Sequence, residues 1–430
     1  MRILVLSINY WPDETGIAAF NIWRCEYLAS RGHQVTICTG PPYYPEWRVP
    51  EPYRGKLWQR EERNGVTILR SWMFVPQALN TKKRILHEAS FLVSSFARAL
   101  ASRKPDLIYT VSPPLGLALT ASTLSRLWRV PFVFDVQDLQ PDAAVELGMM
   151  TGQSMIRALY RIERLAYERA ALVSTITEGM RQRILEKKIG EGGKGIDPAK
   201  VVLFPPRADS SLYTLRERTD GAAFRQRYGL QGKLIVSHSG NMGVKQGLEV
   251  ILEAAALSRQ RPEIQYLFVG DGAMRSALEE QARARALGNV LFLPLLESDE
   301  FHQMLAATDI ALVTQQRVVS NIVFPSKTVT LLCAGCPVIA SVNAESEVAR
   351  AVARSGAGLV IEAENADALF HAIDQLSRSP ETLAGMSVRA RHFAKENWDE
   401  RRTLPRMEEH FLQCVERWLN PCSRPVGPAQ

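Results

Sequence analysis

The sequence predicts an α/β protein made of two doubly wound, Rossmann-like domains. Short runs of β-branched and other apolar residues alternate along the chain with segments of helical spacing, which is the pattern of parallel sheets covered by helices. The chain has 430 residues, whereas a single hydrophobic core stops growing at roughly 250–300 residues. The alternation also starts again at Lys233–Ser239 after a polar stretch, so a second domain is expected there.

The first half begins with a buried strand at Ile3–Ile8 and a helix near Ala18–Ser30, which ends before a glycine. Further β-branched runs and amphipathic segments continue the pattern. We expect strands at Val35–Cys38, Val66–Arg70, Asp106–Val111, Phe132–Asp135 and Ala171–Thr175, and helices near Lys83–Ser102, Leu115–Trp128 and Gln153–Arg169.

The second half repeats this architecture without repeating the sequence. Pro205-Pro206 and the polar stretch Asp209–Gly232 place the boundary near residue 207. The domains are therefore predicted as 1–207, 208–398 and a segment 399–430, whose helix packs back on the first domain and whose Pro-rich tail is frayed. We expect the two domains to face each other across a deep cleft, the default ligand site of such folds. The strands of the second half are expected at Ile264–Val269, Val290–Leu293, Ile310–Val313, Pro337–Ala340 and Gly358–Ile361, and the last helix near Glu400–Leu419.

Composition excludes several classes of protein. Apolar residues make up 46% and charged residues 23%, and the six cysteines are scattered, so a disordered chain or a disulfide-stapled domain is not expected. The net charge is +7, and up to Arg207 there are 28 basic and 19 acidic residues, or +9, against 24 and 26, or −2, in the remainder. The asymmetry indicates either an anionic partner of the first half or an ordinary solvated surface. No signal peptide and no apolar run of the roughly 18–20 residues that a membrane span needs is apparent, so a soluble or peripheral protein is expected.

Glycine-rich strand–helix junctions are the candidate phosphate sites. Gly16 follows the first strand and precedes a helix, where it could let the backbone approach a ligand or could be a plain turn glycine. The loop Ser237–Glu249 offers three glycines and Lys245 at the corresponding place, which suits a diphosphate, although a glycine-rich loop with a solvated lysine is the other interpretation. Gly270–Gly272 is a further glycine turn on the same side of the sheet.

A helix near residue 326 completes this set. Ser326 and Lys327 in its first turn offer N–H groups, a hydroxyl and a cation to a phosphorylated ligand. The helix ends at Gly335, and Pro337 begins a buried strand. The segments that are distinctive in this order are Ile3–Gly16, Pro41–Pro45, Val136–Leu139, Gly240–Gly247, Gly270–Gly272, Pro325–Lys327 and Gly335–Ile339.

In this combination the chain resembles the family-four glycosyltransferases over nearly its full length, most closely their colanic-acid and exopolysaccharide branch, the WcaI type. The resemblance implies the GT-B fold, a nucleotide-sugar donor as substrate, retention of anomeric configuration, no cofactor and no bound metal. The sequence contains no Asp-x-Asp pair and no His/Cys cluster, which agrees with the expectation of no bound metal. It places Gly16 near the transferred sugar and phosphates, and Lys245 and Lys327 near the leaving diphosphate. The donor-binding residues that it implies are Gly16, Gly240, Asn241, Gly243, Gly270, Asp271, Gly272, Pro325, Ser326, Lys327 and Thr330.

The chain departs from the family's pattern at three places. Gln137-Asp138 stands where the family often has His-Asp, and Gly240-Asn241 replaces Gly-Arg. Ile322 and Thr330 replace two glutamates, so a single hydroxyl stands where a carboxylate normally grips the ribose. We still expect activity, with Asp138 and Gln137 contacting the sugar and Lys245 stabilising the leaving group; Asp138 could equally be a structural cap.

The acceptor side is predicted in the first half. Lys82, Lys83 and Arg84 precede a helical stripe of apolar residues, which suits either a membrane surface or a core-facing helix with a solvated start. Pro41–Trp47, which contains Tyr43, Tyr44 and Trp47, could form an acceptor wall or a rigid loop. Cys333 and Cys336 form a lone CxxC motif at a helix end, for which zinc or redox chemistry is disfavoured.

The leading hypothesis is a transferase that moves a sugar to a lipid-linked or oligosaccharide acceptor in surface polysaccharide biosynthesis. We expect it in the cytoplasm, peripheral on the inner face of the cytoplasmic membrane, with no nucleic-acid partner. A GT-B-fold sugar-nucleotide epimerase and a catalytically weak, glycosyltransferase-like binding protein remain open.

Overall fold

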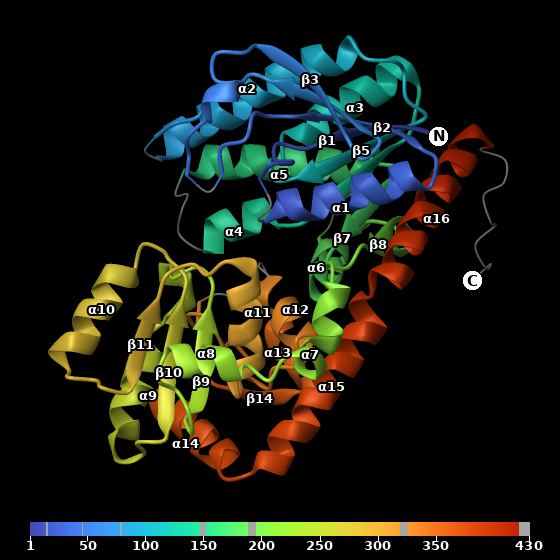
Figure 1. Cartoon of the computed structure of the whole chain (residues 1–430). Helices are drawn as coiled ribbons and strands as arrows, with labels where there is room; N and C mark the ends of the chain where they lie inside the picture. Colours follow the sequence, from blue (N-terminus) through green and yellow to red (C-terminus); the bar gives the residue numbers. More distant parts are fainter. Residues whose placement is uncertain are drawn as a thin grey trace. The chain divides into compact units, whose positions relative to one another are not determined.

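The computed structural model describes residues 1–13, 16–44, 46–77, 80–146, 152–187, 195–318 and 326–420. The chain forms two compact units (Figure 1). The N-terminal unit consists of Met1–Pro205 together with Arg401–Gln430, and the C-terminal unit of Pro206–Glu400. The chain therefore passes from the first unit to the second and returns to the first.

Within the described residues, the sheet of the N-terminal unit has eight strands in the order β3-β4-β2-β1-β5-β6-β7-β8. All neighbouring pairs are parallel except β3 and β4, which are antiparallel. The strands are β1 (Arg2–Leu6), β2 (Gln34–Thr39), β3 (Trp58–Arg63), β4 (Val66–Ser71), β5 (Leu107–Ser112), β6 (Phe132–Val136), β7 (Leu172–Thr175) and β8 (Val201–Leu203). The helices are α1 (Ile17–Ser30), α2 (Thr81–Leu100), α3 (Leu117–Trp128), α4 (Gln140–Glu146), α5 (Gln153–Arg169), α6 (Glu178–Glu186) and, after the second unit, α16 (Glu400–Leu419).

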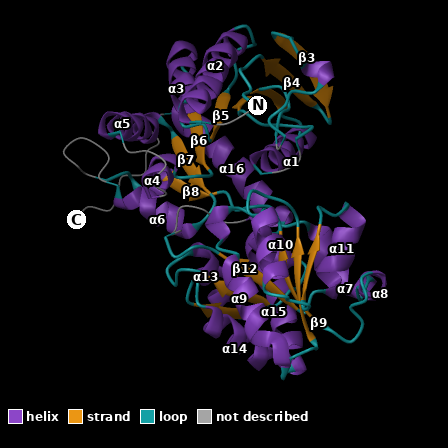
Figure 2. Cartoon of the chain, turned by 90° about the vertical axis from the view of Figure 1, so that its left-hand side faces the viewer, coloured by secondary structure: helices purple, strands orange, loops and turns teal. Residues whose placement is uncertain are grey.

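Two layers of helices cover this sheet. Helices α1 and α16 share one hydrophobic core with β1, β2 and β5, while α2 and α3 lie side by side on the other face (Figure 2). The α16 residue Phe411 is fully buried, with its ring centroid 5.1 Å from that of Tyr109 and 5.7 Å from that of Phe204. Its neighbour Glu408 accepts hydrogen bonds from Tyr27 and Arg31. These contacts make the last helix part of the N-terminal unit.

The edge strand β3 was not predicted from the sequence. Its residues Trp58–Arg63 are mostly charged and lie alternately exposed and half-buried, because an edge strand has only one neighbour and can turn a whole face to solvent. Central strands such as β5 are buried at every residue, which explains why their apolar runs were recognisable.

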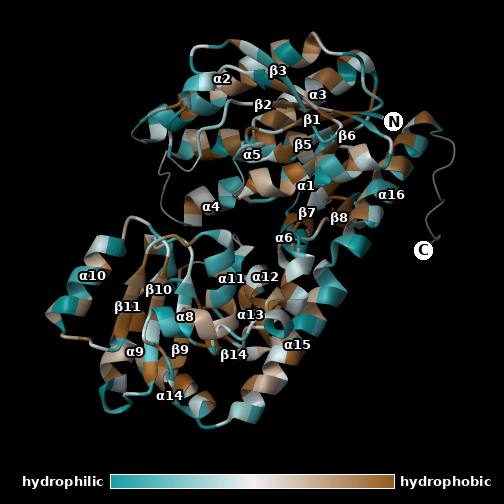
Figure 3. Cartoon of the chain, viewed as in Figure 1, coloured by the Kyte–Doolittle hydropathy of each residue, from teal (hydrophilic) through white to brown (hydrophobic). Residues whose placement is uncertain are grey.

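Within the described residues, the sheet of the C-terminal unit has six parallel strands in the order β11-β10-β9-β12-β13-β14. The apolar residues concentrate in its strands, so β10 and β11 are mainly brown in Figure 3, whereas helix α10 is mainly teal. The strands are β9 (Leu234–Ser239), β10 (Ile264–Val269), β11 (Val290–Leu293), β12 (Ile310–Thr314), β13 (Val338–Ser341) and β14 (Gly358–Ile361). The helices are α7 (Leu215–Arg218), α8 (Ala222–Arg227), α9 (Glu249–Leu257), α10 (Arg275–Ala284), α11 (Ser298–Ala307), α12 (Ser326–Cys333), α13 (Glu347–Ser355), α14 (Ala366–Ser377) and α15 (Pro380–Trp398).

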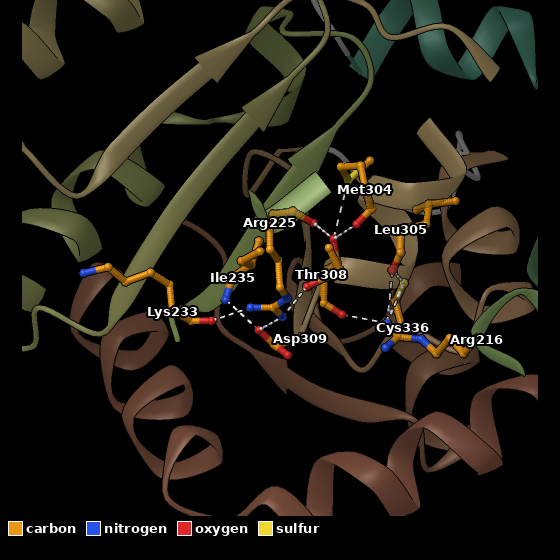
Figure 4. Close-up of polar contacts among 11 residues, drawn as sticks. Arg216, Arg225, Lys233, Ile235, Met304, Leu305, Thr308, Asp309 and Cys336 are labelled. Atoms are coloured by element: carbon orange, nitrogen blue, oxygen red, sulfur yellow. Dashed lines mark hydrogen bonds and ion pairs between the residues drawn. The ribbon is translucent and has the colours of Figure 1, made fainter. Parts of the chain in front are cut away.

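Two arginines attach the segment before β9 to this unit (Figure 4). Arg225 donates to the carboxylate of Asp309 at 2.8 Å, and the same carboxylate oxygen accepts the main-chain N–H of Ile235 at 2.7 Å. Arg216 donates to the main-chain carbonyl of Thr308 at 2.6 Å and contacts the sulfur of Cys336 at 3.6 Å. Charge-assisted hydrogen bonds to main-chain groups hold the first strand in place.

Candidate active site

Two glycine loops meet at the carboxyl ends of β9 and β10. Gly240 follows β9 with φ 117°, and Gly270 follows β10 with φ 131°, both in the region that favours glycine. The N–H of Gly240 donates to the carbonyl of Val269 at 2.9 Å. A Cβ atom on Gly270 would overlap the carbonyl oxygen of Gly240. Gly270 is therefore required by the close approach of the two backbones, and Gly240 by its positive φ, because a Cβ atom there would meet only the side chain of Lys327, at 4.0 Å.

The loops stay in contact beyond these two glycines. The N–H of Met242 donates to the carbonyl of Asp271 at 2.8 Å, and the N–H of Met274 donates to the carbonyl of Met242 at 2.9 Å. Gly272 has φ 153°, and a Cβ atom there would overlap Met242. Asn241 and Asp271 are exposed at the rim of the paired loops. This pairing brings Gly240, Asn241, Gly243, Gly270, Asp271 and Gly272 together at one edge of the sheet.

Lys327, in the first turn of α12, reaches over this edge. Its Nζ lies 3.3 Å from Nδ1 of His238, the penultimate residue of β9. His238 is fully buried, and burial followed by the nearby charge of Lys327 lowers the pKa of its imidazole well below the ordinary value. Burial also lowers the pKa of Lys327 to about 7. The imidazole is thus neutral, and within the described part of the chain no buried carboxylate offsets the charge of the neighbouring amine.

The remaining predicted donor residues that the structure describes lie in the loop after β9 and on helix α12. Lys245 is exposed in a 3₁₀ turn at Val244–Gln246, and its main-chain carbonyl accepts the N–H of Gln316 at 2.9 Å. Ser326 is exposed at the start of α12, and Thr330 is half-buried one turn later. Pro325 and Ile322 lie outside the described residues.

In the N-terminal unit, a cavity of about 360 Å³ gathers most of the residues predicted on the acceptor side. We call it the first cavity. Lys82 and Lys83 do not line it and are exposed in the first turn of α2. The predicted residues that do line it are Gly16, Tyr43, Tyr44, Trp47, Arg84 and Asp138, with Asn9, His87, Glu88, Pro113 and Pro114 among the others.

Gly16 leaves a helix terminus open at this cavity. It precedes α1 with φ 57° and makes no side-chain cap, and a Cβ atom there would meet nothing within 4 Å. The N-terminal N–H groups of α1 are thus not covered by a capping side chain. Such a terminus favours an anion or a ligand hydroxyl.

Two residues of α2 that the sequence did not single out also face the first cavity. Burial raises the pKa of Glu88 above its ordinary value, although Arg84 lies 3.3 Å from its carboxylate. His87 is buried, its Nδ1 lies 2.6 Å from the carbonyl oxygen of Phe74, and burial lowers its pKa. The sequence predicts that both residues lie on a helix. It does not show which face of that helix is buried, so neither residue could be placed at a cavity.

The side chains of the neighbours Gln137 and Asp138 lie in different places, one in the core and one at the first cavity. Gln137 is buried, and its side-chain amide donates to the carboxylate of Asp135 at 3.0 Å. The carboxylate of Asp135 is fully buried and forms an ion pair with Arg24 at 2.6 Å. It also accepts a hydrogen bond from the hydroxyl of Tyr109 at 2.9 Å. The side chain of Gln137 therefore belongs to a polar network in the core. Asp138 is half-buried and lines the first cavity.

Helix α2 turns part of its apolar stripe outward. The buried residues of the helix are His87, Phe91, Ser95 and Ala99. Of the predicted stripe, Ile85, Leu86 and Val93 are 44%, 53% and 73% exposed. Leu92 and Phe96 of the same stripe are half-buried. The helix therefore packs one face on the core and has a solvated basic start, as the alternative expected, while part of its apolar stripe is exposed.

Comparisons with known proteins agree with this architecture. Residues 15–207 match the model of the "glycosyl transferase 4-like domain", and residues 221–393 match that of "glycosyl transferases group 1". The chain is 34% identical over 411 residues to WcaI of Escherichia coli (strain K12), a protein provisionally named a colanic acid biosynthesis glycosyl transferase, covering 94% of this chain and 98% of WcaI. The chain belongs to the family-four glycosyltransferases.

Solved structures show that this glycosyltransferase has the GT-B fold. Sucrose-phosphate synthase from Thermosynechococcus elongatus superposes with a TM-score of 0.71 at 17% identity, covering 96% of this chain and 99% of that one. The Anabaena protein HepE, solved in complex with UDP, also gives 0.71 at 16% identity, covering 96% and 100%. The prediction of two parallel-sheet, Rossmann-like domains is confirmed, with β3 as the antiparallel exception.

The CxxC motif lies in the interior of the C-terminal unit of the glycosyltransferase. Cys333 and Cys336 are buried, burial raises the pKa of both thiols, and the sulfur of Cys336 accepts from Arg216. Among the described residues, no three His, Cys, Asp or Glu side chains lie together as metal ligands. In the same part of the chain, no helix is long and apolar enough to cross a membrane.

On the donor side, His238 is a residue that sequence reasoning missed. It lies inside the segment Ser237–Gly240, whose glycine was recognised but whose histidine was not considered. The available signal was a run of polar residues at the end of an otherwise apolar strand, just before a glycine loop. That position is where ligands bind in open α/β sheets.

Proposed function

We propose that this glycosyltransferase transfers a sugar, with retention of configuration, from a nucleotide-sugar donor to a lipid-linked or oligosaccharide acceptor in surface polysaccharide biosynthesis. The observation that carries the donor half is the paired glycine loops with Lys327 above them. Loop N–H groups, the N-terminus of α12 and a nearby cation are what a diphosphate requires. HepE was solved with UDP and with UDP-glucose, and WcaI is named for colanic acid biosynthesis.

In this proposal Lys327 and Lys245 stabilise the departing diphosphate. Transfer with retention needs no strong protein nucleophile if the leaving phosphate takes the proton of the acceptor hydroxyl on the same face of the sugar. The protein then orients the two substrates and stabilises developing negative charge. The amine of Lys327, with a pKa of about 7 in the empty site, gains a proton and becomes a full cation when a diphosphate arrives. We expect no metal in this step.

The acceptor half of the proposal uses the first cavity. Asp138 contacts the transferred or the accepting sugar there, and Gly16 lets the sugar approach the open terminus of α1. Tyr43, Tyr44 and Trp47 supply aromatic walls of the kind that pack against sugar rings. Gln137 acts as a positioning residue, since its amide is bound to Asp135.

A membrane surface is the place that we propose for the acceptor. The outward stripe of α2, with Ile85, Leu86 and Val93, follows the exposed Lys82 and Lys83. An exposed amphipathic face with a basic end favours the surface of an anionic bilayer. The expected position is the inner face of the cytoplasmic membrane, where nucleotide sugars are available.

Calorimetric titration with a panel of UDP-, GDP- and ADP-sugars, followed by mass spectrometry of lipid-linked acceptors, tests the proposal. We expect one donor class to bind, and the acceptor mass to increase by one sugar. Isomerisation of the donor without an acceptor would indicate the epimerase, and binding without turnover across a broad panel would indicate a binding protein. Sedimentation with phosphatidylglycerol vesicles tests the membrane part: Val93→Glu should reduce binding about tenfold or more, while Val388→Glu, at a 59% exposed position of the other unit, should not.

A further inference from the structure

The N-terminal unit contains a second cavity, of about 670 Å³, beside the first. Four aromatic residues line it: Trp47, Tyr53, Trp72 and Phe74. Trp72 is 43% exposed, so the cavity is open to a ligand from solvent. Aromatic side chains present flat apolar faces, which pack well against the C–H faces of a sugar ring. None of the residues that line this cavity was predicted to bind the donor.

Positive charge dominates its rim. Arg48, Arg54 and Lys56 line the cavity, and Glu46 is the only acidic lining residue among those that the structure describes. Within the described chain, none of these three cations pairs with a carboxylate; Arg54 donates only to the main-chain carbonyl of Val49, at 3.4 Å. This contrasts with the neighbouring Arg70, whose guanidinium is bound to Glu61 at 2.8 Å. Three cations without acidic partners favour an anionic ligand.

Trp47 is the wall between the two cavities. It lines both of them, and its ring centroid lies 5.1 Å from that of Tyr43 and 5.3 Å from that of His87. Its backbone has φ 52°, a conformation that a bulky L-residue adopts only at a cost. Such strain is retained where the surroundings need the side chain in one place, and functional sites are the usual cases.

A second link joins the cavities through α2. Nδ1 of His87, in the first cavity, lies 2.6 Å from the carbonyl oxygen of Phe74, in the second. The N–H of Phe74 is in turn bound to the hydroxyl of Ser90 at 2.9 Å. The aromatic lining of the second cavity is thus fixed to the same helix that lines the first. A ligand in one cavity therefore lies next to a ligand in the other.

We propose that the second cavity is an acceptor subsite that binds an anionic group on the part of the acceptor adjoining the sugar held in the first cavity. The inference rests on the proposed function, because it assumes that the first cavity holds the accepting sugar. The aromatic walls take the ring of the adjoining residue, and Arg48, Arg54 and Lys56 bind its charge. Two acceptor chemistries supply such a charge: the carboxylate of a uronic acid, and the diphosphate that links a sugar to a lipid.

Ligand-observed NMR titrations of the full chain distinguish these sources. The probes are the methyl glycoside of a glucuronosyl disaccharide, its neutral methyl ester, and geranyl diphosphate. We expect an anionic probe to bind about tenfold more tightly than the neutral ester, the effect of a hydrogen bond to a charged group. A preference for the disaccharide acid would identify a uronic acid, and a preference for geranyl diphosphate the lipid-linked diphosphate.

Variants locate the binding. Arg48→Gln and Arg54→Gln should each weaken the anionic probe about tenfold and leave the ester unchanged, whereas Trp72→Ala should weaken both sugars. Lys104→Gln, at an exposed position outside the cavity, removes one positive charge from the same unit and should change nothing. Equal affinity for acid, ester and diphosphate, or equal affinities in Arg54→Gln and Lys104→Gln, would overturn the proposal.

Lys327→Met separates this inference from the donor site. Lys327 belongs to the donor site of the other unit, so this variant should bind nucleotide sugars more weakly while its affinity for the anionic probe stays the same. If the wild type binds no nucleotide sugar but Arg54-dependent probe binding persists, the proposed function fails and the anionic subsite stands. If nucleotide sugars bind but the probes do not distinguish charge, only the subsite is refuted.

Discussion

Nζ of Lys327 lies 3.3 Å from Nδ1 of His238, joining the first turn of α12 to the buried end of β9. The imidazole is neutral because burial lowers its pKa far below the ordinary value. The lysine has no buried carboxylate as a partner among the described residues, and burial brings its own pKa to about 7. The amine of Lys327 can therefore take up a proton when an anion binds beside it.

The first prediction is that donor affinity falls with rising pH between about 7 and 9. A bound diphosphate raises the pKa of Lys327 again, so binding takes up a proton once the pH exceeds the value of about 7 in the empty site. Linkage then weakens binding by up to about tenfold per pH unit. Above pH 7 the diphosphate is fully ionised, so its own titration does not interfere. Calorimetric titrations with UDP at pH 7, 8 and 9 measure the slope.

Variants of Lys327 and Lys245 show which lysine causes the pH dependence of donor affinity. Lys327→Met should make affinity nearly independent of pH in this range and reduce transfer about 10²-fold, the scale for losing one group that stabilises a leaving charge. Lys245→Ala should also reduce transfer about 10²-fold, yet it should retain the pH slope, because Lys245 is exposed. An undiminished slope in Lys327→Met would contradict the assignment.

The second prediction concerns stability in the absence of donor. The folded-state pKa of Lys327 is about 7, below its ordinary value, so the unfolded chain binds more protons between the two values. The free energy of unfolding therefore rises with pH in that window, and the penalty is largest at pH 7 and below. Lys327→Met removes the penalty and should raise the melting temperature at pH 6.5 by about 2–4 °C for each kcal/mol regained.

The difference in melting temperature between Lys327→Met and the wild type should shrink at pH 10, where the wild-type lysine is neutral in the folded state. Calorimetric melting of both proteins at the two pH values measures it. Saturating UDP should raise the melting temperature of the wild type more than that of the variant, because only the wild type gains the cation–diphosphate contact. A variant that melts lower than the wild type at pH 6.5 would refute the penalty.

The fold could be predicted from the sequence where burial is periodic and local. The strands β5 and β10 are buried nearly throughout, and their apolar runs were recognised. The edge strand β3 was not recognised because it pairs with β4 alone and alternate residues are exposed, so most of its residues are charged and form no apolar run. Local spacing also could not show which face of α2 is buried, since that depends on the sheet beneath the helix.

The candidate site was predictable where a local motif marks it. Gly240 and Gly270 stand out because both have a positive φ that favours glycine, and at Gly270 a Cβ atom would also overlap the neighbouring backbone. His238 and Lys327 are 89 residues apart in the chain, so no motif could connect them. Gln137 was expected to contact the sugar because of its position in the motif, but the direction of its amide is set by Asp135, which the sequence gives no reason to pair with it.

The third prediction tests the contact between the glycine loops. Gly270→Ala should lower the free energy of unfolding by at least about 2 kcal/mol, since it adds backbone strain and an overlap with Gly240. Gly229→Ala is the matched control, because Gly229 also has positive φ, 66°, but its Cβ atom would meet nothing within 4 Å. It should cost only about 1 kcal/mol. Urea unfolding measures both, and equal losses would show that the overlap is relieved without cost.

The last prediction separates the two neighbours at the end of β6. Asp138→Asn should reduce transfer about 10²-fold or more, as expected for a polar group that lines the first cavity and contacts the reacting sugar. Gln137→Ala removes one hydrogen bond from the buried carboxylate of Asp135, which should cost about 1.5–3 kcal/mol of stability. Its effect on transfer should be smaller, because it reaches the site only through the backbone. Melting curves and initial transfer rates on the same preparations test both variants. A Gln137→Ala protein with full stability and lost activity would instead place the amide on the substrate.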